Sequence, residues 1–288
     1  MATLPPIEYM SPRTLSEAVS LLEAYGDRAR ILAGGTDLLV LMKDRALTPQ
    51  YLVDITRIPN LDGITMNGEK SLRIGALTHV RTIEKSPVIK DKFTSLAEAA
   101  GHFGTVQIRH MATIAGNICR ASPAADLAPP LLTFDTSVKL VNAKDERIVP
   151  LTEFFTGPAR SVIKPNELLT EVYCAGNGNR RSKFLKLGRT FEDLAKVSVA
   201  VAINLEEGVS RQVRIALGAV APQPIRATTA ESTLEGQAPT KDLIRTAAQT
   251  AAEETKPITD LRSTADYRRK VSRVLVERAL TQITRAGG

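Results

Sequence analysis

The sequence lacks tryptophan, and aromatic residues make up only 4% of its 288 residues. Its two cysteines, Cys119 and Cys174, allow at most one disulfide and cannot by themselves hold an iron–sulfur cluster with the usual four thiolate ligands. A reducing, cytoplasmic compartment is therefore expected. No hydrophobic run reaches the roughly 18–20 residues of a spanning helix, and residues 1–6 have no signal-peptide pattern. We therefore expect neither a membrane span nor a secretory signal.

Several chemical signatures are also missing. The three histidines, His79, His102 and His110, are not at metal-ligand spacing, so no metal site is expected. A Gly-x-Ser-x-Gly elbow, a Gly-x-Gly-x-x-Gly fingerprint and a Walker P-loop are all absent. The sequence therefore predicts no catalytic side chains of these kinds and no single-loop nucleotide binder.

The formal net charge of +7 comes from Lys and Arg residues spread along the chain. They are not interleaved with aromatic residues, which disfavours nucleic-acid binding. A positive surface also attracts phosphate-bearing cofactors or acidic partner subunits.

Periodicity and turn residues divide the chain into three predicted units, residues 1–56, 57–176 and 177–288, with a linker at 175–179. The first unit begins with a helix capped at Thr14, and Asn67-Gly68 marks a hairpin in the second. The second unit is also expected to contain a helix over 126–132, with prolines in its first turn, and a further hairpin around Lys144-Asp145. The third unit places three strands before three helices, an α+β pattern. The strands expected there are 184–187, 198–203 and 213–217, and the helices are 230–234, 242–254 and 267–284.

Two glycine-containing stretches stand out, Ala33-Gly34-Gly35-Thr36-Asp37 and Thr113-Ile114-Ala115-Gly116-Asn117. Each follows a short apolar run, and each is interpreted as a turn whose open backbone N–H groups could cradle a phosphate. Thr36 or Asp37 is expected to cap a helix over residues 38–43. Two such turns in neighbouring units suit a long dinucleotide held between subdomains.

Two further features are open to more than one interpretation. Residues 186–196 place five charges between two apolar strands, either as a solvated connection or as a mobile loop over a cofactor. Cys119 follows the second glycine stretch and is expected to be a small buried hydrophobe, with a role near a ligand as the alternative.

The two glycine stretches resemble one family when they are taken together with two other motifs. These are Gln107-Ile108-Arg109, which lies between the stretches, and residues 121–126, which follow them in the order seen in that family. They are similar to the FAD-binding medium subunit of molybdenum hydroxylases, as in carbon monoxide dehydrogenase and the flavin domain of xanthine dehydrogenase. The likeness runs essentially end to end. It implies a p-cresol-methylhydroxylase-type FAD-binding fold of two α+β subdomains, followed by a C-terminal domain with a three-stranded sheet and helices.

The resemblance also implies a cofactor, partners and contact residues. FAD would receive electrons from two [2Fe-2S] clusters of a small subunit and pass them to NAD or another acceptor. A large subunit would carry the molybdenum–pterin site, in a heterotrimer that is often doubled. The residues implied to contact FAD are Ile31, Leu32, Ala33, Gly34, Gly35, Thr36, Asp37, Leu38, Phe103, Thr113, Ile114, Ala115, Gly116, Asn117, Asp126, Leu169 and Lys186.

The second stretch departs from the family pattern, because Ala115-Gly116 stands where Gly-Gly is usual. A methyl group there requires a negative φ at Ala115. Two alternatives to an electron-transferring subunit stay open. One is a scaffold protein with a degenerate FAD site, and the other is a self-contained FAD reductase resembling UDP-N-acetylenolpyruvoylglucosamine reductase. Bound flavin discriminates against the first, and a substrate domain with a positioned proton donor would be needed for the second.

Overall fold

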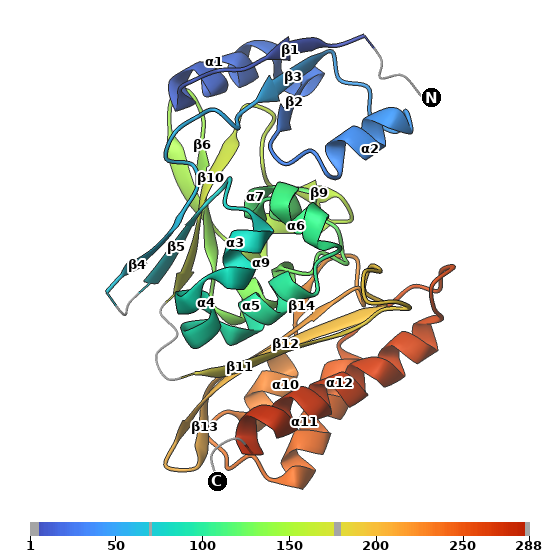
Figure 1. Cartoon of the computed structure of the whole chain (residues 1–288). Coiled ribbons are helices and arrows are strands. Elements are labelled where there is room, and N and C mark those ends of the chain that lie inside the picture. Colours follow the sequence, from blue (N-terminus) through green and yellow to red (C-terminus); the bar gives the residue numbers. More distant parts are fainter. Residues whose placement is uncertain (1–5, 69–70, 176–179, 286–288) are drawn as a thin grey trace.

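The computed structural model describes residues 6–68, 71–175 and 180–285. Three main sheets follow one another along the molecule, with the N-terminal unit at one end and the last three helices at the other (Figure 1). The predicted linker residues 176–179 lie outside the described residues, as do residues 69 and 70 of the predicted hairpin.

The N-terminal unit is a parallel three-stranded sheet of order β1-β3-β2. The predicted helix start is confirmed, because the Thr14 hydroxyl accepts a hydrogen bond from Glu17 N at 3.1 Å. Strand β1 was not predicted, since its three residues show no alternation. Tyr9 of β1 donates a hydrogen bond to Asp54 of β3. The elements of this unit are β1 (Glu8–Met10), α1 (Leu15–Tyr25), the 3-10 helix η1 (Gly26–Arg28), β2 (Ala29–Leu32), α2 (Leu38–Lys43) and β3 (Tyr51–Asp54).

The middle unit is built on a five-stranded sheet of order β4-β5-β10-β6-β7, whose pairs are antiparallel. The two predicted hairpins are its outer pairs, β4 (Ile64–Asn67) with β5 (Ser71–Gly75) and β6 (Ser137–Val141) with β7 (Glu146–Pro150). The strand that joins them, β10 (Leu168–Ala175), was not predicted.

Short helices cover this sheet and connect it to the third unit. The helix predicted over 126–132 is confirmed, with Pro129 and Pro130 in its first turn. The helices are α3 (Val80–Lys85), α4 (Pro87–Lys92), α5 (Thr94–Gly101), α6 (Val106–Met111), α7 (Ile114–Cys119), α8 (Ala128–Thr133) and α9 (Leu151–Phe154), and a small hairpin follows of β8 (Phe155–Gly157) and β9 (Arg160–Ser161).

The third unit confirms strands followed by helices, with one correction: a short strand, β14, adds a fourth member to the predicted three-stranded sheet. It pairs with the end of β13, where two residues are too few to show a pattern in sequence. The elements are β11 (Arg181–Leu187), β12 (Val197–Glu206), β13 (Val209–Gly218), β14 (Ile225–Arg226), α10 (Thr228–Leu234), α11 (Lys241–Glu253) and α12 (Ala265–Arg285).

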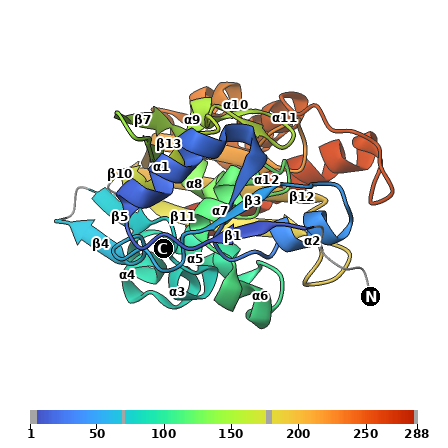
Figure 2. The same cartoon turned by 90° about the horizontal axis from the view of Figure 1, so that it is seen from above.

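The sheet of the third unit is buried on both faces, which explains the unbroken apolar run of β12. Ala200 and Ala202 belong to the core of the middle unit, whereas Val199 and Val201 pack with α10, α11 and α12. These helices lie on the side of the sheet away from α5 (Figure 1). In the view from above, the N-terminal unit is in front (Figure 2). The small alanines let this sheet approach the middle unit closely. Among the described residues, no helix is both long and apolar enough to cross a bilayer.

Candidate cofactor site

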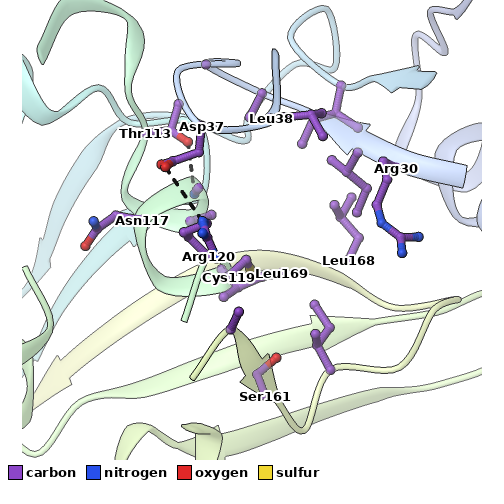
Figure 3. A pocket seen from close by; sticks show the side chains of 18 of the residues that line it. Arg30, Asp37, Leu38, Thr113, Asn117, Cys119, Arg120, Ser161, Leu168 and Leu169 are labelled. Carbon is purple, nitrogen blue, oxygen red and sulfur yellow. Dashed lines mark hydrogen bonds and ion pairs between the residues drawn. The ribbon is translucent and has the colours of Figure 1, made fainter. Parts of the chain in front are cut away.

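A cavity of about 710 Å³ opens between the N-terminal and middle units. Its walls come from the loop between β2 and α2, from α7, from the β8–β9 hairpin and from the start of β10 (Figure 3). This volume lies within the range of small-molecule and cofactor sites, about 300–1,000 Å³. The two glycine stretches singled out in the sequence meet on its wall.

The first stretch forms an irregular loop, residues 33–37, with unpaired amides. From Gly34 to Leu38, no backbone N–H donates a hydrogen bond to any group in the described part of the chain. Gly35 has a φ of +70°, a conformation that favours glycine. These amides line a cavity and need acceptors from outside the chain.

Gly34 serves a different purpose, since it lets the two stretches touch. A Cβ atom on Gly34 would lie 1.9 Å from the carbonyl oxygen of Met111, which is backbone and cannot swing away. No other residue fits without moving the loop away from the segment that leads into α7.

The second stretch is not the predicted open turn but the start of helix α7. Its amides are consumed within the chain: Ile114 N donates to Thr78 O at 3.1 Å, and Ala115 N donates to Ala76 O at 3.2 Å. The Thr113 hydroxyl caps the helix by accepting from Gly116 N at 3.1 Å. Ala115 lies inside this helix and outside the set of residues with positive φ, so its methyl group causes no backbone strain.

The predicted side-chain cap on α2 is also absent. Asp37 occupies the N-cap position of α2 without accepting a hydrogen bond there. Its Oδ1 instead lies 3.7 Å from Nε of Arg120, at the end of α7 (Figure 3). Both side chains are partly exposed, so this ion pair contributes little stability.

Apolar side chains contribute to the other walls. Phe103, between α5 and α6, and Leu169 of β10 both line the cavity. Cys119 also lines it, and its side chain is exposed rather than buried as expected, because the last turn of α7 faces the opening. The Oδ1 of Asn117 is buried and has no hydrogen-bond partner among the described residues.

Asp126 and Lys186 form a buried ion pair beyond the cavity wall, 2.8 Å apart. Burial raises the pKa of Asp126 to about 6, and the charge of Lys186 opposes this shift only in part. Asp126 Oδ2 accepts from Lys186, but its Oδ1 is buried and has no partner in the part of the chain that the structure describes. The pair therefore keeps one open acceptor.

The residues singled out from the sequence fall into two groups. Four do not line the cavity: Leu32, Ile114, Asp126 and Lys186. Those that do are Ile31, Ala33, Gly34, Gly35, Thr36, Asp37, Leu38, Phe103, Thr113, Ala115, Gly116, Asn117 and Leu169.

Sequence reasoning missed the β8–β9 side of the cavity. Thr156, Arg160 and Ser161 line it there, and Leu168 joins Leu169 at the start of β10. These short, irregular segments carry no periodic pattern, so no signal in the sequence could have placed them.

Comparison with known proteins identifies the family. Residues 5–174 match the model of the FAD binding domain in molybdopterin dehydrogenase. Residues 182–283 match the model of the CO dehydrogenase flavoprotein C-terminal domain.

Individual relatives are similar to this chain over nearly its whole length. The chain is 35% identical to the carbon monoxide dehydrogenase medium chain of Hydrogenophaga pseudoflava over 280 residues, 96% of each chain. It is 32% identical to the glyceraldehyde dehydrogenase medium chain of Sulfolobus acidocaldarius over 281 residues, 97% of this chain and 99% of the relative. It is also similar to a chain in the structure of reconstituted CO dehydrogenase from Oligotropha carboxidovorans, with a TM-score of 0.95, 31% identity and coverage of 98% of this chain and 99% of that one. The chain therefore belongs to the FAD-binding medium subunits of the molybdenum hydroxylases, the flavoprotein components of multi-subunit dehydrogenases.

Proposed function

We propose that this chain holds FAD in the cavity and relays electrons through it, from the [2Fe-2S] clusters of a small subunit to NAD or another acceptor. The observation that carries the proposal is the loop at residues 33–37, whose amides have no acceptor in the described chain. Bound FAD supplies the redox centre, and the residues described here bind and orient it.

The FAD pyrophosphate is proposed to lie against the amides from Gly34 to Leu38. Phosphate oxygens are strong acceptors, and unpaired backbone N–H groups at a glycine loop favour them. Because the amides of Ile114 and Ala115 are already bonded, α7 is proposed to contribute side chains instead, chiefly Asn117. Thr113 helps by fixing the first turn of that helix.

The flavin ring is proposed to pack against Phe103, with Leu169 as a second apolar contact, because an aromatic face and an aliphatic side chain suit a planar ring. Two orphaned oxygens fit hydroxyl groups of the cofactor. Asn117 belongs to the cavity lining, whereas Asp126 lies behind the wall, so its Oδ1 is proposed to be reached where bound FAD extends past the cavity. Leu32 and Ile114 are proposed to support this site from behind the wall. Lys186 holds Asp126 in place for the same purpose.

The charged segment, residues 186–196, is proposed to border the flavin. It runs from β11 to β12, and the ring of Phe191 lies 5.3 Å from that of His102, the residue before Phe103. Phe191 and Leu194 are both more than half exposed. This segment is thus proposed to control access of the electron acceptor.

The partners and organisation are also proposals. The relatives named above are medium chains of dehydrogenases for carbon monoxide and glyceraldehyde. Relatives with such different names support a division of labour in which a large molybdopterin subunit selects the substrate and a small [2Fe-2S] subunit delivers electrons. We propose that the complex is a heterotrimer, which can be doubled into a dimer of heterotrimers, and that it works in the reducing cytoplasm. Within this chain, the proposed domain boundaries are at 56/57 and 176/177.

Titration of the purified full-length chain with FAD tests the cofactor site, and acid release of the bound flavin tests its stoichiometry. We expect equimolar FAD with the visible absorption bands of oxidised flavin. A colourless chain that takes up no FAD, even with its partner subunits present, would favour the scaffold alternative.

Anaerobic mixing with the reduced small subunit tests the electron route. We expect bleaching of the flavin absorbance, followed by recovery when NAD, a quinone or oxygen is added in separate experiments. An unchanged flavin spectrum after mixing would contradict the proposed relay.

A further inference from the structure

The backbone next to Phe103 is held by two buried cations. Three successive carbonyl oxygens each accept a hydrogen bond: His102 O from Lys186 Nζ at 3.0 Å, Phe103 O from Arg109 at 3.1 Å and Gly104 O from Arg109 at 2.9 Å. Both Arg109 bonds come from a single nitrogen, Nη1. Residues 102–104 form an irregular turn between α5 and α6, so no regular secondary structure fixes them.

Arg109 is itself fixed from the opposite side. Its side chain is only 7% exposed, and its Nε lies 2.9 Å from Oε2 of Glu84 on α3. Glu84 also accepts two hydrogen bonds from Arg81, each of 2.8 Å. Burial alone would raise the pKa of Glu84, but the Arg81 hydrogen bond and the Arg109 charge hold it below its usual value. The carboxylate therefore stays ionised and keeps Arg109 oriented.

Burying a guanidinium is costly unless its charge and donors are satisfied. Here the ion pair with Glu84 balances the charge, and Nη1 donates to the two carbonyls beside the cavity, whereas Nε lies close to Glu84 without making a hydrogen bond in the described chain. The backbone orientation at Phe103 determines where its ring points. Arg109 does not line the cavity, and its Nη1 is already bonded to this turn, so the turn is its structural link to the cavity.

We propose that Arg109 is a positioning residue, which holds the Phe103 ring in the cofactor cavity by binding the carbonyls of Phe103 and Gly104. This inference rests on the proposed function, because it assumes that FAD packs on Phe103. It also gives a physical role to Gln107-Ile108-Arg109, a stretch that the sequence alone left without one.

A double-mutant cycle on the full-length chain tests the proposal, using Phe103→Leu, Arg109→Gln and the pair together. We expect each single variant to raise the dissociation constant for FAD about tenfold, and the pair to equal Phe103→Leu within about threefold, because the two act as one unit. The fluorescence of bound flavin should rise in Arg109→Gln as the ring contact loosens. Arg109→Lys keeps the charge but not the planar fork, and should give an intermediate value.

Arg81→Gln is the matched control, since Arg81 bonds to the same carboxylate but touches neither carbonyl. Because Arg81 acts on the turn only through Glu84, its loss should raise the FAD dissociation constant clearly less than the loss of Arg109 does. Thermal unfolding of each apo variant checks the fold, and if Arg109→Gln fails to fold, Arg109→Lys completes the cycle.

Two results would overturn the inference while leaving FAD binding intact. One is an Arg109 variant that binds FAD as tightly as Arg81→Gln. The other is a double variant whose loss equals the product of the single losses, which would show that Arg109 acts independently of Phe103. Failure of the unmodified chain to bind FAD would instead overturn the proposed function.

Discussion

Residues 33–37 and 113–117 have similar compositions, but their backbones differ in what they offer a ligand. The first forms an irregular loop with free amides from Gly34 to Leu38, whereas in the second Thr113 caps a helix and the following amides are already bonded. Glycine in a sequence therefore does not by itself indicate free donors. Whether the backbone amides are free depends on whether neighbouring parts of the chain already supply acceptors for them. The following variants test this contrast through FAD binding, from the largest expected effect to the smallest.

Gly35→Asp should have the largest effect. The φ of +70° at Gly35 disfavours a side chain, and an added Cβ would lie 3.1 Å from Leu32 Cδ1 and 3.2 Å from Leu39 Cδ1, so the loop must shift. A carboxylate on this loop also adds negative charge close to the proposed pyrophosphate. We expect a loss of binding free energy of roughly 3–4 kcal/mol, measured by FAD titration. Gly35→Asn is the matched control, because it has nearly the same size and backbone strain without the charge. Equal losses in the two variants would contradict the placement of the phosphates.

Gly34→Ala should have the second-largest effect on FAD binding. The added Cβ would lie 1.9 Å from Met111 O, so the loop must move away from the α6–α7 segment. We expect a destabilisation of about 1–3 kcal/mol, as for other overpacked sites, together with weaker FAD binding. Chemical denaturation and FAD titration measure the two effects. Unchanged stability would show that the close approach of the two stretches is not required.

Asp126 should make FAD binding depend on pH. Because burial raises its pKa to about 6, acidification through that value removes the charge that makes Oδ1 a strong acceptor. The FAD affinity should therefore fall as the pH drops below about 6, by up to about tenfold.

The stability of the apo chain should change in the opposite direction. A carboxyl whose pKa is raised by folding stabilises the folded chain at low pH. This contribution is fully present below the pKa of the unfolded chain, near 3.9, and is lost as the pH rises through about 6. Asp126→Asn should flatten both pH profiles. Identical profiles with and without this carboxyl would assign the titration to another group.

Ala115→Gly should have the smallest effect on binding, although it restores the usual family pattern. The Ala115 amide already donates to Ala76 O, and its helical backbone needs no glycine. We expect FAD affinity to change by less than about threefold and stability to fall by roughly 0.5–1 kcal/mol. A large gain in affinity would show that the second stretch does contact phosphate through its backbone.

Local patterns predicted much of this fold. The apolar run of β12, the Thr14 cap and the prolines of α8 each depend on neighbouring residues, and each is confirmed. Gly34 and Gly35 were recognised because a tight backbone approach needs glycine within a short stretch.

Features that depend on distant partners were not predictable. Strand β10 pairs with β5, about one hundred residues earlier, and nothing local distinguishes it. The ion pair of Asp126 with Lys186 spans 60 residues. The family resemblance singled out both residues as FAD contacts, but their pairing was not predicted. At α7 the local signal was present but misinterpreted, because Thr113 is a common helix cap and the glycine was taken for a turn.

The position of β10 has a consequence for biosynthesis. It is the central strand that joins two otherwise separate hairpins, and its first residues, Leu168 and Leu169, close one wall of the cavity. While the ribosome is still making the preceding part of the chain, the two hairpins have no shared partner and the pocket has an open side. Cofactor loading must therefore wait until β10 has emerged and paired, which makes the capture of FAD a late event in the maturation of this subunit.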